Sequence, residues 1–226
     1  KQGYKTAFIG KVGNDIFGRQ LKAVVREAGI NTDGLVTDES VNTTLAFVHT
    51  LPGGDREFSF YRNPGADMML SESDIDYKLV QNSRIFHFGS LSMTGEICEA
   101  ATKKAVETAK ESGAIISFDP NLRENLWDSL DKAREKIAYG ISECDILKIS
   151  DNEIQWFTGE QDFDRAVEIL RGRYGNIKLL LLSLGKNGSR AYCGENSAFA
   201  PAVPANTIET TGAGDTFCGG ILAKVL

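Results

Sequence analysis

The stretch KLLLLSLG, residues 178–185, decides the fold because almost every side chain in it is apolar. A strand with one face in water alternates apolar and polar residues, whereas a strand of a parallel sheet is covered on both faces. The run is also far shorter than the roughly 20 residues that a membrane-spanning helix needs. We therefore predict that 178–185 is a buried strand of a mostly parallel sheet.

Strands and helices alternate along the chain around this stretch. Runs rich in β-branched and aromatic residues are each followed by a segment whose apolar residues recur at helical spacing. In the first such segment Phe17, Leu21 and Val24 fall on one face, and Gly29 ends the helix. This alternation predicts an α/β fold with helices on both sides of the sheet. The other expected strands are 6–13, 84–93, 114–121 and 145–150, and the expected helices are 15–28, 95–112, 129–143, 152–158 and 162–174.

One segment breaks the alternation, with two strands and no helix between them. TTLAFVHTL and REFSFYR flank PGGD, and both alternate with a period of two, which predicts a β-hairpin. A hairpin of this kind can cover a site, contact another subunit or decorate a sheet edge, and the pattern leaves these roles open. The predicted organisation is an α/β domain formed by residues 1–42 and 64–226, and a hairpin at 43–63.

Composition excludes several kinds of partner. The 226 residues carry a net charge of −6, which repels phosphate backbones and anionic lipid, so we expect neither nucleic acid nor membrane as a partner. The four cysteines show no C-x-x-C spacing and only two histidines occur, which argues against a zinc site or a disulfide framework. Free cysteines suit a reducing compartment, so the expected localisation is cytoplasmic.

The segment ETTGAGDTF, residues 209–217, gives the clearest sign of chemistry. Gly212, Ala213 and Gly214 let the backbone approach a ligand, and a helix start offers free N–H groups and the positive end of the helix dipole. Together they favour a phosphate site. Asp215 becomes useful there if a hydroxyl must lose its proton while attacking the phosphate. Alternatively, Thr211 caps the helix and Asp215 only complements the dipole, and these residues alone leave both interpretations open.

A second glycine-bearing turn, SLGKNGS, follows the buried strand at residues 183–189. Its backbone N–H groups, the Ser183 hydroxyl and the Lys186 ammonium suit phosphates, although KNGS would equally make a hairpin turn. The P-loop pattern is absent, and GKVGNDIFG lacks the spacing of the dinucleotide motif. Both phosphate-competent loops follow strands, at the end of an α/β sheet where ligands usually bind.

TTGAGDTFCGG resembles the C-terminal signature of the ribokinase-like, PfkB-type family of carbohydrate kinases. FIGKVGNDIFG, FSFYRNPGAD, FDPNLRENLW, ISDNEIQWFTG and SLGKNGS occur in the order and spacing of that family, and FYRNPGAD with DPNLRENLW is most similar to its fructokinase branch. The resemblance implies a ribokinase-like three-layer fold with a mostly parallel central sheet and a small β lid. It also implies a strand and a Gly-Gly…Asn sugar-binding stretch before residue 1, and further helices after Leu226.

The resemblance implies a role for each matching residue. Asp215 would be the base for the sugar hydroxyl, and the N–H groups of Gly212, Ala213 and Gly214 would cradle the transferred phosphoryl group. Mg²⁺ is implied near Asn152 and Gln155, which occupy the first and fourth positions of an N-x-x-E motif, and a monovalent cation such as K⁺ is implied in the loop of Glu209. The implied ATP site comprises Asn121, Arg123, Ser183, Gly185, Lys186 and Gly188, and the implied sugar site comprises Tyr61, Arg62, Arg123 and Asp215.

The expected function is transfer of the ATP γ-phosphoryl group to a sugar hydroxyl, with fructose as the sugar and fructose 6-phosphate as the product. A 2-keto-3-deoxygluconate kinase or another PfkB sugar kinase is an alternative, because Arg62 or Arg123 could bind a substrate carboxylate. A sugar-binding sensor that no longer catalyses is a second alternative. It is favoured by Gln155, which replaces the Glu of the family's N-x-x-E motif, and by Glu209, which replaces the family's usual Asp. The intact Asp215 argues against it. The expected partners are the sugar, ATP and a second copy of the chain, bound through the hairpin lid.

Overall fold

The computed structural model describes residues 3–50, 56–204 and 210–226. The chain forms two compact units, the first made of residues 1–83 and 92–108 and the second of 84–91 and 109–226. The first unit contains the hairpin together with the N-terminal strands, so the predicted separation of residues 43–63 as a lid domain stays a prediction. No described helix is long and apolar enough to cross a bilayer.

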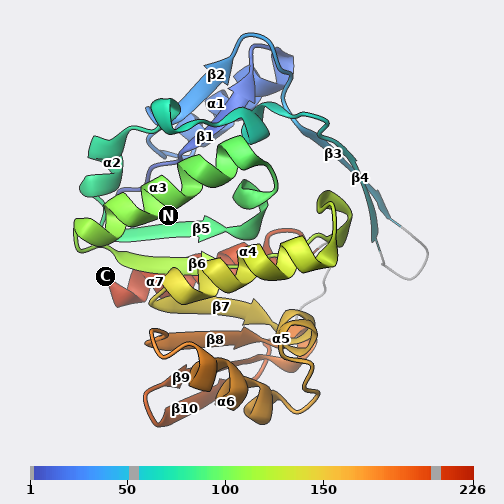
Figure 1. Ribbon diagram of the computed structural model, residues 1–226, viewed down its shortest axis with the longest axis vertical. Helices are drawn as coiled ribbons and strands as arrows, with labels where there is room; N and C mark the ends of the chain where they lie inside the picture. The colour runs from blue at the N-terminus through green and yellow to red at the C-terminus, as the bar shows by residue number, and fades with distance from the viewer. Residues whose placement is uncertain (1–2, 51–55, 205–209) are drawn as a thin grey trace. The chain divides into compact units, whose positions relative to one another are not determined.

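The first unit begins with a β-α-β arrangement. Strand β1 (Gly10–Gly13) runs parallel to β2 (Leu35–Asp38), and α1 (Ile16–Glu27) connects them (Figure 1). Asp15 caps α1, because its carboxylate accepts the Gly18 N–H at 2.8 Å and the Thr43 N–H at 2.7 Å. The apolar face predicted for this helix forms, but in the described residues it stays 46–54% exposed at Phe17, Leu21 and Val24.

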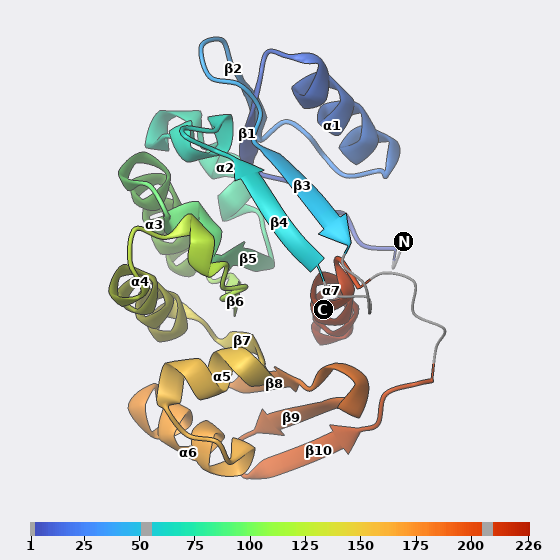
Figure 2. The same cartoon turned by 90° about the vertical axis from the view of Figure 1, so that its right-hand side faces the viewer.

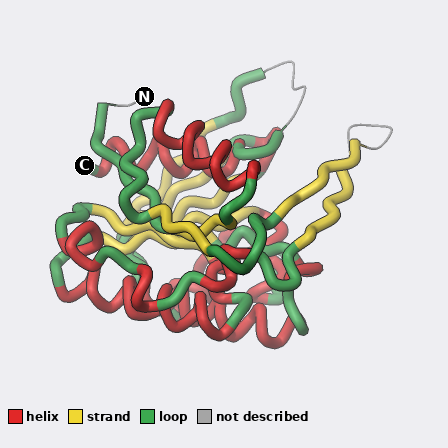
Figure 3. The backbone as a smooth tube through the Cα atoms, turned by 90° about the horizontal axis from the view of Figure 1, so that it is seen from above, coloured by secondary structure: helices red, strands yellow, loops and turns green. Residues whose placement is uncertain are grey.

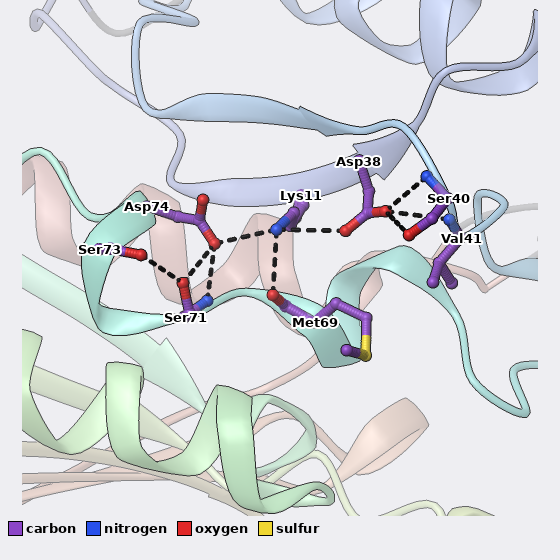
Figure 4. A network of polar contacts seen from close by, with 8 residues as sticks. All are labelled: Lys11, Asp38, Ser40, Val41, Met69, Ser71, Ser73 and Asp74. Atoms are coloured by element: carbon purple, nitrogen blue, oxygen red, sulfur yellow. Dashed lines mark hydrogen bonds and ion pairs between the residues drawn. The ribbon is translucent and has the colours of Figure 1, made fainter.

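An ion-pair network centred on Lys11 joins the segments of this unit (Figure 4). The Lys11 Nζ lies 3.0 Å from Asp74 Oδ2 and 3.2 Å from Asp38 Oδ2, and it donates to the Met69 carbonyl at 3.1 Å. All three donors of the ammonium are therefore used. Strand β1 is thereby tied to the end of β2 and to the 3₁₀ turns at Ala66–Met69 and Glu72–Asp74.

The predicted hairpin is confirmed. Strands β3 (Leu45–Thr50) and β4 (Arg56–Tyr61) are antiparallel and run side by side in Figures 2 and 3. Phe47 and Tyr61 meet edge to face on one side, with ring centroids 5.4 Å apart, and Phe58 and Phe60 stack on the other at 6.0 Å. Both sides keep exposed apolar side chains, since Phe47 is 57% exposed and Val48 is 47% exposed.

The second unit contains a six-stranded sheet in the order β10-β9-β8-β7-β6-β5. Strands β5 to β8 are parallel and β9 and β10 are antiparallel, which confirms the predicted mostly parallel sheet. The stretch that decided the prediction is β8, where Leu180, Leu181 and Leu182 are at most 1% exposed. The strands are β5 (Ile85–Gly89), β6 (Ile115–Asp119), β7 (Ile146–Ser150), β8 (Leu179–Ser183), β9 (Ser189–Cys193) and β10 (Asn196–Ala200).

Helices of the second unit cover both faces of this sheet. Gly140 of α4 (Leu130–Glu143) lies so close to the sheet that an added Cβ would be 2.3 Å from the Phe118 ring. Helix α7 (Ala213–Val225) lies on the opposite face, against Lys148, and appears behind the sheet in Figure 1. The remaining helices are α2 (Tyr77–Gln81), α3 (Glu96–Glu111), α5 (Asp151–Thr158) and α6 (Phe163–Arg173), with 3₁₀ turns at Ser90–Met93, Glu124–Leu126 and Gly185–Asn187.

Candidate active site

The first turn of α7 carries the proposed base. Gly212 occupies the N-cap with φ 74°, a left-handed conformation that glycine adopts without strain, so the alternative in which Thr211 caps the helix is wrong. No side chain of the cap occupies the first N–H groups of the helix, which lack intrahelical partners by geometry. Asp215 lies in this turn and is exposed. The turn therefore combines anion-binding backbone with an accessible carboxylate.

One of the three predicted cradle groups is already engaged. The Ala213 N–H donates to the Thr210 carbonyl at 3.1 Å and closes the turn that enters the helix. The Thr216 N–H donates to the Gly212 carbonyl at 2.8 Å and begins the helical pattern. The predicted cradle of Gly212, Ala213 and Gly214 thus lies on one turn, although its binding role stays a prediction.

A buried ion pair supports this turn from the sheet side. The Lys148 Nζ lies 3.1 Å from Asp119 Oδ1 and 3.0 Å from Asp119 Oδ2, and the two side chains are only 7% and 6% exposed. A Cβ added to Gly214 would lie 3.1 Å from that Nζ. The Lys148 ammonium therefore touches the α-carbon side of the first turn of α7.

Other titratable groups share this face of the sheet. Burial raises the pKa of Asp119 to about 6, with Lys148 opposing the shift and Glu153 and Asp215 adding to it. Burial also raises the pKa of the Cys218 thiol to about 11. His87 is exposed at the surface, yet the protein atoms around its ring lower its pKa below 6.5 against the opposing charge of Asp215.

These shifts identify the charged groups near the turn. The pKa of Asp119 leaves its carboxyl mostly ionised at neutral pH. The His87 ring is neutral there, and its Nδ1 lies 2.9 Å from the Ser117 Oγ, which gives the histidine a hydrogen-bond partner within the sheet. Cys98, Cys144 and Cys218 are buried free thiols, whereas Cys193 is exposed. The acidic and basic side chains that interact on this face of the sheet are thus Asp119, Lys148, Glu153 and Asp215.

The segment after β6 places two predicted site residues next to a carboxylate. Asn121 has φ 45°, the left-handed region that asparagine tolerates better than most residues. The Leu122 N–H donates to Glu153 Oε1 at 2.8 Å, and Arg123 donates to the Leu122 carbonyl at 3.0 Å. The other oxygen of Glu153 accepts the Ser150 N–H at 2.9 Å, within a capping box at the start of α5.

The two residues predicted near Mg²⁺, Asn152 and Gln155, do not occupy the position of Glu153 beside the segment after β6. The Gln155 Nε2 donates to the Gln161 carbonyl at 3.0 Å, and Asn152 is exposed with its N–H bonded to Asp151. Residues two apart on a helix differ by about 200° in direction, so Gln155 and Glu153 face different sides of α5. Glu209 lies outside the described residues. Within those residues, no group of three or more His, Cys, Asp or Glu side chains is arranged to hold a metal.

The predicted ATP loop after β8 is the turn of a hairpin. Strands β8 and β9 are antiparallel, and the Leu184 N–H donates to the Gly188 carbonyl at 2.9 Å. Gly185 and Gly188 have φ of 52° and 103°, and a Cβ on Gly188 would lie 2.2 Å from the Ala200 carbonyl oxygen. Ser183 ends β8, and Lys186 is exposed at the tip. The turn is confirmed, and its binding of ATP stays a prediction.

In the first unit, Arg62 is held at the end of the hairpin. Its guanidinium is 7% exposed and bonds both Asp67 Oδ2, at 2.6 Å from Nη2, and the Thr94 hydroxyl, at 2.7 Å from Nη1. Asp67 also accepts the Thr44 hydroxyl. Tyr61 is 68% exposed. Arg62 therefore has protein partners that fix its position, and the sugar-binding roles of Tyr61 and Arg62 stay predictions.

Comparison with known proteins adds to this geometry. The model of the pfkB family carbohydrate kinase matches residues 1–226. The chain belongs to the pfkB family. As a carbohydrate kinase of this family, it is a phosphotransferase whose acceptor is an alcohol group.

Several relatives of this pfkB-family kinase are fructokinases. Fructokinase-1 of Oryza sativa subsp. japonica is 41% identical over 224 residues, which cover 99% of this chain and 69% of the relative. The structure of a Vibrio cholerae O395 fructokinase with fructose, ADP and calcium ion bound has a TM-score of 0.90 and 30% identity, over 98% of this chain and 70% of that one. A Xylella fastidiosa fructokinase with bound ATP has a TM-score of 0.89 and 31% identity, over 99% and 69%. These likenesses confirm the predicted ribokinase-like fold.

Sequence reasoning missed three residues of the site in this pfkB-family kinase. Lys148 is the one charged side chain within β7 (Ile146–Ser150), and a buried lysine needs a partner, which Asp119 supplies. Glu153 was overlooked because the N-x-x-E motif was assigned to Asn152 and Gln155 and not to Ser150 and Glu153. The sequence SDNE, with serine and glutamate three residues apart, is a capping-box signal that could have identified it.

Proposed function

We propose that this chain is an ATP-dependent fructokinase, which transfers the γ-phosphoryl group of ATP to a hydroxyl of fructose and gives fructose 6-phosphate. The observation that carries the proposal is the exposed Asp215 in the first turn of α7, directly after the left-handed Gly212. Fructose is favoured as the sugar because the relatives and solved structures named above are fructokinases.

Asp215 would accept the proton that the sugar hydroxyl loses as its oxygen attacks the γ-phosphorus. The bond from that phosphorus to the β–γ bridging oxygen breaks in the same transfer, and ADP leaves. Proton removal by a positioned carboxylate is useful because an alkoxide is a far better nucleophile than an alcohol. The N–H groups at the start of α7 would stabilise the negative charge on the transferred phosphoryl oxygens. The helix dipole acts in the same direction, since its positive end lies at this turn.

The turn after β8 would hold the ATP phosphates with Ser183, Gly185, Lys186 and Gly188. Asn121 and Arg123 would add contacts from the segment after β6, and Arg123 would also approach the sugar. Mg²⁺, when bound, supplies positive charge that neutralises the phosphates. Glu153 fits it better than Asn152 or Gln155, since a carboxylate is the ligand that Mg²⁺ favours and this one adjoins the 121–123 segment. A monovalent cation such as K⁺ would bind in the loop of Glu209.

The hairpin would be a lid over the sugar and a contact between two copies of the chain. Tyr61 is exposed and available for the sugar, whereas Arg62 would act partly by holding the end of β4 through Asp67. A lid is useful because water would otherwise accept the phosphoryl group. The exposed apolar side chains on both faces of the ribbon suit burial in a dimer.

The test is Asp215→Asn in a turnover assay with a panel of sugars. We expect kcat with fructose to fall by about 10²–10⁴, the usual loss for a positioned base, while ATP still binds. Asp131→Asn is the matched control, because Asp131 is also an exposed aspartate in the first turn of a helix, α4. Near-normal turnover of Asp215→Asn would remove Asp215 from the mechanism.

The same panel separates the alternatives. A kinase for 2-keto-3-deoxygluconate would turn over that acid much faster than fructose, which would overturn the proposed substrate and keep the reaction class. A sugar-binding sensor would bind sugar without turnover of any member of the panel, and that result would contradict the proposed function as a whole.

A further inference from the structure

The buried lysine behind the catalytic turn has an unusual set of contacts. Lys148 donates to Asp119 Oδ1 at 3.1 Å, and Asp119 Oδ2 lies 3.0 Å from the same ammonium as an ion-pair contact. Among the described residues, Asp119 is the hydrogen-bonding partner of Lys148. The Nζ is also the nearest heavy atom to the Cβ position of Gly214, at 3.1 Å, followed by Lys148 Cε at 3.6 Å. The ammonium therefore lies between Asp119 on one side and the first turn of α7 on the other.

The ion pair is oriented with its positive end toward the helix. No Asp119 atom lies within 4 Å of the Cβ position of Gly214 in the described structure, whereas the Lys148 ammonium does. Both side chains are more than nine-tenths buried, so water screens this charge weakly. The N-terminus of α7 already carries a partial positive charge from its dipole. The lysine adds to that potential at the turn that Asp215 shares.

The charges that face this turn come from several elements. Burial raises the pKa of Asp119 to about 6, so above that pH its carboxyl is mostly ionised. The negative charge of Asp215 adds to the raised pKa of Asp119, and the positive charge of Lys148 opposes that rise. The other titratable groups that interact with these residues are His87 on β5, Glu153 on α5 and Cys218 on α7.

We propose that Lys148 is a positioning residue for phosphoryl transfer, whose buried ammonium, held by Asp119, supports Gly214 and keeps the first turn of α7 electropositive. This inference rests on the proposed function, because it assigns the transferred phosphoryl group to that turn. The lysine acts through the helix and does not need to touch the substrate. Asp119 serves to keep the ammonium charged and in place within the sheet.

The experiment compares three variants with wild type in the full chain: Lys148→Met, Asp119→Asn and the double variant. Thermal melting, kcat, the KM values for ATP and sugar, and the dependence of kcat on pH are measured for each. Lys148→Met leaves a buried carboxylate without its cation, so it should melt at lower temperature. The double variant is neutral at both positions and should recover most of that melting temperature.

The double variant separates a positioning role from a merely structural one. We expect its kcat to stay about 10- to 100-fold below wild type although its stability is restored, because the ammonium behind α7 is still missing. The KM for sugar should change less than kcat. A double variant whose kcat returns to within about twofold of wild type would overturn the proposal, since the pair would then matter only for folding.

The pH profile gives a second readout, which a structural role would not move. Asp119→Asn removes the carboxyl whose pKa burial raises to about 6 and keeps the lysine, so the change of kcat with pH near 6 should be smaller than in wild type. A change of kcat near that pH as large as in wild type would contradict the proposed electrostatic coupling.

Nucleotide binding separates this inference from the proposed function. If wild type phosphorylates no sugar, the proposed function fails, and calorimetry with ATP and with ADP still tests Lys148. We expect Lys148→Met to weaken the binding of ATP by about tenfold and the binding of ADP by less than twofold, because only ATP carries the phosphoryl group assigned to the α7 turn. Equal losses for both nucleotides, or none, would overturn the role of Lys148.

Discussion

At the scale of single residues, Lys11 shows how one ammonium stabilises the first unit. Burial alone would lower the pKa of Lys11, but hydrogen bonds and charges from Asp74 and Asp38 outweigh it and raise that pKa above 10.5. Burial likewise opposes ionisation of Asp74, yet Ser71 and Lys11 hold its pKa below 3.8. Lys11→Met should therefore lower the free energy of unfolding by about 1–3 kcal/mol at pH 7, measured by urea denaturation.

The effect of pH has a definite sign. A carboxylate with a lowered folded pKa stabilises the protein above its unfolded pKa, and that stability is lost as the pH falls through the folded value. The difference in unfolding free energy between wild type and Lys11→Met should thus become smaller as the pH falls below 3.8. It should also become smaller as the pH rises from 10.5 through the raised pKa of Lys11. Lys178→Met is the control, since Lys178 also pairs with an aspartate but is 78% exposed. If Lys11→Met and Lys178→Met lower the free energy of unfolding equally, the proposed role of Lys11 is contradicted.

At the scale of elements, the direction in which each side chain of α5 points decides which residue we expect near Mg²⁺. Glu153 adjoins the segment after β6, and Gln155 bonds Gln161 instead. Glu153→Gln should therefore raise the free Mg²⁺ needed for half-maximal rate, by an amount equivalent to roughly 1 kcal/mol or less. Gln155→Glu is the matched control and should leave the titration unchanged, measured as initial rate at saturating ATP and sugar. If the Mg²⁺ dependence of the rate changes only in Gln155→Glu, the assignment of the N-x-x-E motif to Asn152 and Gln155 is correct.

Helix α5 also shows which features of the molecule could not be predicted from the sequence. The order of strands and helices could be predicted because periodicity and glycine stops are local signals. The hairpin could be predicted from alternation, and the glycine-bearing turn at the start of α7, which we propose is catalytic, from the GAGD segment. The register of the N-x-x-E motif could not, since Asn152 and Gln155 satisfy its spacing as well as Ser150 and Glu153 do. The pairing of Lys148 with Asp119 depends on the neighbouring strands β6 and β7, which the sequence does not align.

At the scale of the whole molecule, the hairpin is the proposed contact between two copies. Phe47 is 57% exposed and Val48 is 47% exposed, on opposite faces of the ribbon, so burial of either face would remove apolar area from water. The double change Phe47→Ser and Val48→Ser should convert a dimer to a monomer in sedimentation velocity at micromolar concentration. Phe199→Ser on β10 is the control, because Phe199 is 58% exposed and lies outside the hairpin. A wild-type protein that sediments as a monomer would contradict the proposed dimer.

The close approach of α4 to the sheet constrains how this sequence can change over time. Glycine inside a helix costs about 1 kcal/mol relative to alanine, so Gly140→Ala would be favourable on propensity alone. The new methyl group would lie 2.3 Å from the Phe118 ring, which is fully buried and has no room to move. A smaller residue must therefore replace Phe118 before position 140 can gain a side chain. The two positions form an ordered evolutionary path, in which descendants accept the second substitution only after the first.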